Sequence, residues 1–329
     1  MNPASTADAP APSPAPGSRG VSVIIPAYNY AQYLEGAVRS ALGQTYRPVE
    51  VIIVDDGSTD GTPELGERLA SELPGVRYVR QENAGLSAAR NTGIGLAAYP
   101  FVTFLDCDDE FLPEMAATLM SEFEAQPPET ALIACRTIRI DREGRLIGQK
   151  RLPALGSRAY TAAEILMKTR FPCCVVARRA CFDAVGLFDP GLRSSEDRDM
   201  WIRIGVGHRI YYVDEALVRI RRHDSNMSRN TGRMRAAMRR VRQKAIAARV
   251  VPLSHVAYWL RVFAFDHFQG AWMYWDEGRA LPALFHILVS MAIWPLPLDH
   301  RDLFEPPLFR LRAAGRFILH APFRRFQHS

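Results

Sequence analysis

The sequence predicts an α/β protein built on a mainly parallel sheet. From residue 21 onward, short β-branched apolar runs alternate with helical patterns, which is typical of parallel strands joined by crossover helices. Acidic and turn-forming residues follow several of these runs, at the edge where open α/β sheets bind ligands. Apolar residues make up 48% of the chain and charged residues 23%, a mixture that can bury a core.

Four strands are predicted in the first half: Val21–Ile25, Val49–Val54, Val76–Val79 and Phe101–Leu105. The first crossover helix is indicated by Leu34, Val38 and Leu42, at four-residue spacing, and is expected to end near Gly43. In the second crossover helix, Thr62 is expected to be the N-cap and Pro63 the first helical residue. The third is expected from about Leu86 to Ala97.

The second half is less periodic. Beyond Pro113 we expect a helix to about Ala125, a strand over Ala131–Ile140 and a turn over Asp141–Gly144. An irregular stretch follows to about Arg193. A helical period returns at Glu196–Ile204, with Met200, Trp201 and Ile204 on one face.

Composition divides the chain into three predicted parts. Residues 1–20 hold five Pro and five Ala and are expected to form a disordered leader. Residues 21–230 are the α/β domain, with halves 21–112 and 113–230. Residues 231–329 are a Trp-rich helical extension that carries 15 Lys/Arg against 6 Asp/Glu, a net charge of +9.

Charge and cysteine usage exclude several classes of protein. The five cysteines show no repeated pair spacing, so neither a zinc site nor a disulfide framework is expected, and a reduced, cytoplasmic compartment fits best. No recognition motif accompanies the basic tail, so a nucleic-acid partner is not expected. The apolar stretch 280–298 is interrupted by prolines, which leaves a helix too short to cross a membrane.

Two acidic clusters follow predicted strands. Asp106-Cys107-Asp108 packs carboxylates closely enough to require a cation or solvent, and a divalent ion would meet that need. Asp55-Asp56-Gly57-Ser58 could place a carboxylate against a nucleotide base. Each cluster alone could equally be a polar turn that ends a strand.

Four segments together resemble the family 2 glycosyltransferases: Val21 to Asn29, Val54 to Asp60, Asn83 to Asn91, and Asp106-Cys107-Asp108. They occur in the family's order, and the resemblance runs from about residue 20 to 228. It implies a GT-A fold, a nucleotide-sugar donor, a divalent metal (Mn²⁺ or Mg²⁺) and inversion at the anomeric carbon.

The resemblance also implies roles for single residues. Pro26, Ala27 and Tyr28 would line the base pocket, and Asp56 would accept a hydrogen bond from the base, with UDP favoured. The remaining donor contacts are Arg90, near the sugar and diphosphate, Asp106, on the ribose or sugar, and Asp108, on the metal.

The segment Ser195 to Trp201 resembles the acidic motif on the acceptor side. An alcohol is a poor nucleophile, so a carboxylate must take its proton, and we assign Asp197 as this base beside Glu196. Relatives often carry an aromatic residue where this chain has Arg198, which leaves the acceptor open. Arg222 is assigned to the diphosphate, and His223 to the metal or the diphosphate.

The sequence therefore predicts an inverting transferase that acts on a glycan or a lipid-linked glycan of the cell-surface polysaccharide type. The alternative is a relative that binds a nucleotide sugar without turning it over. The basic extension suggests a peripheral site on an anionic membrane, although a cap over the acceptor cleft or an oligomer interface would give the same pattern.

Overall fold

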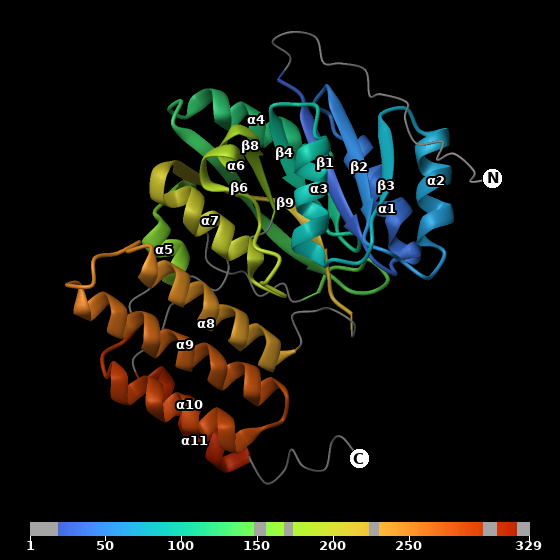
Figure 1. Ribbon diagram of the computed structural model, residues 1–329. Coiled ribbons are helices and arrows are strands. Elements are labelled where there is room, and N and C mark those ends of the chain that lie inside the picture. Colours follow the sequence, from blue (N-terminus) through green and yellow to red (C-terminus); the bar gives the residue numbers. More distant parts are fainter. Residues whose placement is uncertain (1–18, 148–155, 168–173, 224–229, 299–307, 321–329) are drawn as a thin grey trace. The chain divides into compact units, whose positions relative to one another are not determined.

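The computed structural model describes residues 19–147, 156–167, 174–223, 230–298 and 308–320. The chain forms two compact units: residues 1–161 with 172–226, and residues 162–171 with 227–329. Most of the expected leader, residues 1–18, lies outside the described part. The first unit carries the strands (Figure 1).

A mixed sheet forms the first unit, in the order β3-β2-β1-β4-β8-β6-β9-β5, with β7 beside β9. The strands β3, β2, β1 and β4 are parallel, as are β6 and β9, whereas β8 runs antiparallel to both neighbours. The bounds are β1 (Val21–Ala27), β2 (Val49–Asp55), β3 (Val76–Arg80), β4 (Phe101–Phe104), β5 (Glu110–Phe111), β6 (Thr130–Ile140), β7 (Arg158–Tyr160), β8 (Val175–Arg178) and β9 (Arg209–Arg221). The predicted α/β sheet is confirmed.

Helices flank this sheet: α1 (Ala31–Leu42), α2 (Thr62–Glu72), α3 (Leu86–Leu96), α4 (Met115–Ala125), α6 (Ala180–Val185) and α7 (Glu196–Gly207). The α1 helix buries Leu34, Val38 and their neighbours, as their spacing predicts. A Cβ at Gly93 would lie 2.3 Å from Ile24 Cγ2, so a glycine there lets α3 approach β1 closely.

Two local predictions need correction. Thr62 is the first residue of α2 and Gly61 is its N-cap, one position earlier than expected. The stretch expected to be irregular contains β7, β8 and α6. Strand β8 has only four residues, too few to show a period, yet its Val175–Ala177 are fully buried in the sheet.

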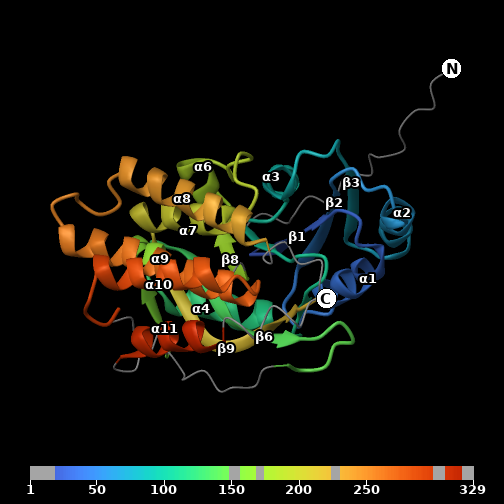
Figure 2. The ribbon, with the colours of Figure 1, turned by 90° about the horizontal axis from the view of Figure 1, so that it is seen from below.

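The second unit is helical, with α5 (Ala162–Met167), α8 (Thr231–Ala247), α9 (Val256–Asp276), α10 (Ala280–Ile293) and α11 (Phe309–His320). Figure 2 shows α9, α10 and α11 side by side, and their inner faces share one apolar core around Phe265, Trp275, Ile287 and Phe317. Among the described residues, none of the helices is both long and apolar enough to span a bilayer.

Candidate active site

The acidic clusters lie at one edge of the sheet. Strands β2, β1 and β4 are parallel neighbours, so the residues that follow them emerge on the same side. Asp55 ends β2, and Asp106 to Asp109 follow β4. The register of the sheet therefore brings the two clusters to one edge, although about fifty residues separate them in sequence.

Asp55 and Asp56 are buried and have different tasks. Asp55 accepts hydrogen bonds from Ser58 N (2.8 Å) and Tyr78 Oη (2.7 Å), so it stabilises the turn after β2. Asp56 accepts from Gln81 Nε2, Ala84 N and Gly85 N at 2.7–2.9 Å, and so holds the segment that leads into α3. Three of about four acceptor positions on the Asp56 carboxylate are thus occupied by the protein.

Arg90 joins the two halves of the domain. Its side chain is 2% exposed; Nη1 donates to Glu196 Oε1 at 2.6 Å and Nη2 to Asp106 Oδ1 at 2.8 Å. Arg90 comes from α3, Asp106 follows β4, and Glu196 opens α7. The structure therefore places three residues from separate sequence motifs in direct contact.

Asp108 and His223 form a second contact between distant segments. His223 Nε2 lies 2.8 Å from Asp108 Oδ2, and the His223 ring stacks on Tyr33 with centroids 5.5 Å apart. Burial and the nearby Asp106 carboxylate raise the pKa of Asp108. The ionised carboxylate of Asp108 is thus held at a cost in free energy, which a cation close to Asp106 and Asp108 would reduce.

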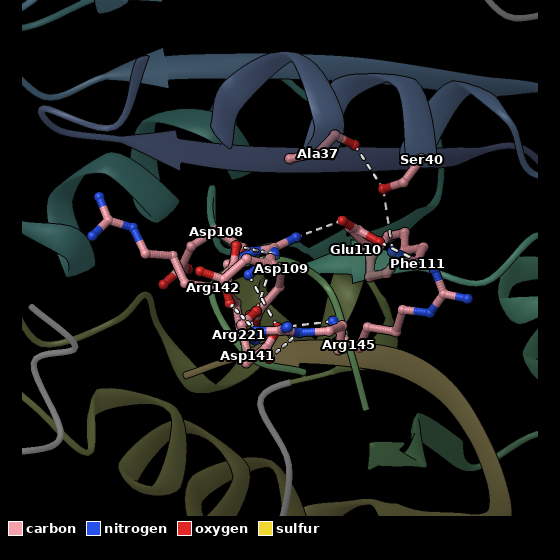
Figure 3. A network of polar contacts seen from close by, with 12 residues as sticks. Ala37, Ser40, Asp108, Asp109, Glu110, Phe111, Asp141, Arg142, Arg145 and Arg221 are labelled. Atoms are coloured by element: carbon pink, nitrogen blue, oxygen red, sulfur yellow. Dashed lines mark hydrogen bonds and ion pairs between the residues drawn. The ribbon is translucent and has the colours of Figure 1, made fainter. Parts of the chain in front are cut away.

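Arg221 holds the acidic loop in place, a role that its basic segment does not indicate (Figure 3). Its Nε donates to the Asp108 carbonyl at 3.0 Å, its Nη2 to Glu110 at 2.6 Å, and its backbone N–H to the Asp109 carboxylate at 2.9 Å. Its Nη1 also donates to the carbonyls of Asp141 and Arg142. These contacts fix the end of β9, which leads to His223, against the Asp108 loop.

Asp197 lies in the first turn of α7 and is partly buried. Its Oδ1 accepts from the Arg198 backbone N–H at 2.6 Å. Burial raises the pKa of Asp197, and the positive charges of Arg90 and Arg198 oppose the rise. A carboxylate with a raised pKa is a stronger proton acceptor than an ordinary aspartate, which suits general-base chemistry.

The other predicted donor residues are spread along the same edge. Pro26 and Ala27 are buried at the end of β1, whereas Tyr28 directly after them is 47% exposed. Arg222 is exposed beside Arg221 and His223. Tyr28 and Arg222 are therefore accessible to a ligand, whereas the side chains of Pro26 and Ala27 are buried.

Among the described residues at this edge, Asp108 and His223 are the pair that could hold a metal. No group of three or more His, Cys, Asp or Glu in the described ranges is arranged as a metal site. Asp108 Oδ2 and His223 Nε2 are nevertheless both ligand atoms, and their 2.8 Å separation is near the ~3 Å between adjacent ligands at about 2.1 Å from an ion. A divalent ion that takes its remaining ligands from substrate phosphates and water fits this pair.

Glu196 predicts a pH dependence of stability. Burial raises its pKa from 4.5 to about 6, so the folded state favours its protonated form. A raised folded pKa contributes stability below pH 4.5 that is lost as pH rises past 6. Between pH 4.5 and 6.5 we expect the free energy of unfolding to fall by about 1.5 kcal/mol more in the wild type than in Glu196→Gln, as urea titrations would measure. Parallel pH profiles for the two proteins would contradict this assignment.

Comparisons with known proteins found a matching family model and several relatives. The model of the family described as glycosyl transferase family 2 matches residues 22–186. The uncharacterized glycosyltransferase YibD of Escherichia coli is 45% identical over 101 residues, which are 31% of this chain and 29% of that protein. The chain spans 64% or less of the length of the first curated relatives that it matches.

Two solved structures share the fold. The structure of Staphylococcus aureus TarS 1–349 in complex with UDP-GlcNAc has a TM-score of 0.61 at 18% identity, over 92% of this chain and 90% of that one. The mannosyltransferase PcManGT of Pyrobaculum calidifontis, in complex with GDP-Man and Mn²⁺, has a TM-score of 0.61 at 19% identity, over 94% and 88%. The expected GT-A fold is confirmed.

The match of the family model over residues 22–186 and the shared fold together define the class of protein. The chain belongs to glycosyltransferase family 2.

Proposed function

We propose that this protein is an inverting glycosyltransferase that moves a sugar from a nucleoside diphosphate to a hydroxyl of a glycan or lipid-linked glycan. The observation that carries the proposal is the contact of Arg90 with both Asp106 and Glu196. It fixes the donor-side acidic motif beside the acceptor-side motif that holds Asp197. A sugar transferase needs its donor-binding motif and its general base close to the same anomeric carbon.

The donor occupies the edge formed by β1, β2 and β4. Tyr28 is exposed there for contact with the base, and Asp56 orders the loop that opens α3. Arg90, Asp106 and Arg222 supply the contacts to the sugar and the diphosphate. The names of the two structural neighbours, one with UDP-GlcNAc and one with GDP-Man, support a nucleotide sugar, and we favour UDP as its nucleotide.

Asp108 and His223 would hold a divalent metal, Mn²⁺ or Mg²⁺. The 2.8 Å pair, the charge of the nearby Asp106 carboxylate and the Mn²⁺ in the name of one neighbour support it. When bound, such an ion neutralises the charge that develops on a departing diphosphate. Arg221 keeps the Asp108 loop and the His223 segment in register for this task.

Asp197 acts as the general base. Its carboxylate takes the proton of the acceptor hydroxyl while the acceptor oxygen forms a bond to the anomeric carbon. The bond from that carbon to the diphosphate oxygen breaks, and the nucleoside diphosphate leaves with the electron pair. Attack opposite the leaving group inverts the anomeric carbon.

The alternative is a relative that binds the donor without transfer. Such a protein would need Asp108 and the base pocket but would have no use for a general base at Asp197. The raised pKa of Asp197 favours the enzyme. A donor that binds without turnover by the wild type, over a range of acceptors, would favour the binding protein.

We place the reaction in the cytoplasm, on the inner face of the membrane. The net charge of +9 over residues 231–329 supports an anionic membrane surface as a partner. A lipid-linked acceptor would be presented at that surface.

Replacing Asp108 by Asn tests the metal assignment. Loss of the negative charge is expected to lower turnover by about 100-fold or more, because Lewis-acid stabilisation is worth several kcal/mol. The thermal shift that a nucleotide sugar gives with Mn²⁺ should disappear as well. Glu67→Gln, an exposed carboxylate on α2, is the matched control and should behave as the wild type. Metal-dependent turnover at the wild-type rate in Asp108→Asn would refute the assignment.

A further inference from the structure

The outer face of α10 is apolar along its length. Leu281, Phe285 and Leu288 lie at helical spacing and are 73%, 60% and 48% exposed, on the side opposite the buried Ala283 and Ile287. Their stripe follows a helix of 14 residues, about 21 Å long. Soluble proteins seldom expose so many large apolar side chains in one row.

Both ends of α10 carry groups suited to a membrane interface. Arg279 precedes the helix, with a side chain 57% exposed. At the other end the Arg261 guanidinium lies 5.9 Å from the centre of the Trp294 ring, and Leu296 is exposed next to it. Between Gly278 and Leu298 the sequence has no carboxylate.

The adjoining helix α11 is amphipathic and basic. It buries Ala313, Ala314 and Phe317 against the core that it shares with α10. Its outer residues combine apolar and positive side chains: Leu311, Arg312, Arg316 and Ile318. No Asp or Glu occurs from residue 308 to 320.

We propose that the outer face of α10 is the surface by which the protein docks on an anionic lipid bilayer, with the helix lying in the plane of the interface. The docking surface rests on the proposed function, which includes an anionic membrane as a partner. The side chains that would insert into that membrane are Leu281, Phe285, Leu288 and Leu296. The apolar row enters the acyl boundary, and Arg279 before α10 and the exposed Arg312 and Arg316 of α11 stay at the level of the phosphates.

Charge favours a bilayer over a second copy of this chain. Arg279 has a carboxylate partner in Glu277, at 3.5 Å, but a symmetric dimer across α10 would bring the exposed Arg312 and Arg316 of α11 near their own copies, and neither residues 278–298 nor residues 308–320 include an Asp or Glu to offset them. An anionic lipid surface supplies the missing negative charge over the whole face. The apolar row and the basic rim are then both satisfied by one partner.

The test compares two substitutions at equal exposure. Phe285 on α10 and Val206 on α7 are each 60% exposed, so Phe285→Glu and Val206→Glu add the same charge at equally accessible positions. The full chain and both variants are sedimented with vesicles of phosphatidylcholine alone and of phosphatidylcholine with phosphatidylglycerol. Leu281→Glu is a second variant, since an acid in the first turn of a helix does not destabilise it.

The wild type and Val206→Glu are expected to bind the anionic vesicles and to lose affinity at high salt. Phe285→Glu and Leu281→Glu should bind about tenfold or more weakly, because each replaces an inserted apolar side chain by a charge. Circular dichroism should show all four proteins equally folded. Donor hydrolysis should be unchanged in the α10 variants, which separates this proposal from the proposed function.

Two results would overturn the proposal. One is binding of Phe285→Glu and Leu281→Glu to anionic vesicles as tightly as the wild type. The other is a wild type that fails to bind vesicles but is dimeric by light scattering, with Phe285→Glu monomeric. That result would assign the face to a second copy.

Discussion

Asp197→Asn is expected to lower turnover by about 10² to 10⁴-fold while the affinity for the nucleotide sugar stays within about twofold of the wild type. The amide keeps the shape and the polarity of the side chain but cannot accept the acceptor's proton. The substitution leaves the ion pairs of Arg90 with Asp106 and Glu196 in place, so the donor side should be preserved.

The measurement is steady-state transfer together with the thermal shift that the donor produces. Asp183→Asn, an exposed acid on α6, serves as the control and should retain full activity. Near-normal turnover in Asp197→Asn would remove Asp197 as the base. Loss of both turnover and donor binding would show that the substitution had damaged the donor site instead.

Arg90→Met is expected to destabilise the protein by about 3 to 5 kcal/mol, because it leaves the buried Glu196 carboxylate without its cation. The methionine fills much of the same volume, so the cost comes from charge and not from a cavity. Adding Glu196→Gln to Arg90→Met should recover part of the loss, since it removes the unpaired charge.

A surface pair of the same residue types provides the control. Arg39 pairs with Glu35 on α1 at 2.7 Å, but its side chain is 58% exposed, so Arg39→Met should have little effect. Urea unfolding of the four proteins completes the comparison. Equal stability of Arg90→Met and the wild type would contradict the view that Arg90 holds the two halves of the site together.

The first half of the fold could be predicted because its strands and helices each have a clear period. The motifs of Arg90, Asp106 and Glu196 could also be identified, because their segments resemble those of the family 2 glycosyltransferases. The contact of Arg90 with Asp106 and Glu196 could not be predicted, because it depends on where the folded chain places the first turn of α7. Strand β8 was missed because four buried residues carry no period.

The supporting residues of the site were harder to predict. Arg221 lies in a basic run with Arg219 and Arg222, and the run gives no sign that one arginine is buried and binds five groups of two loops. Gln81 likewise stands in a polar segment, yet it holds the Asp56 carboxylate at 2.7 Å. Such residues are defined by the tertiary structure and not by local spacing.

The most direct test of the central claim is a thermal-shift and hydrolysis screen of nucleotide sugars, with and without Mn²⁺ or Mg²⁺, on the wild type, Asp108→Asn and Asp197→Asn. Our account predicts that one class of donor raises the melting temperature only with a metal. The shift should vanish in Asp108→Asn and persist without turnover in Asp197→Asn. No stabilisation or hydrolysis of any donor, with either metal, would contradict the assignment of this edge of the sheet as a donor site.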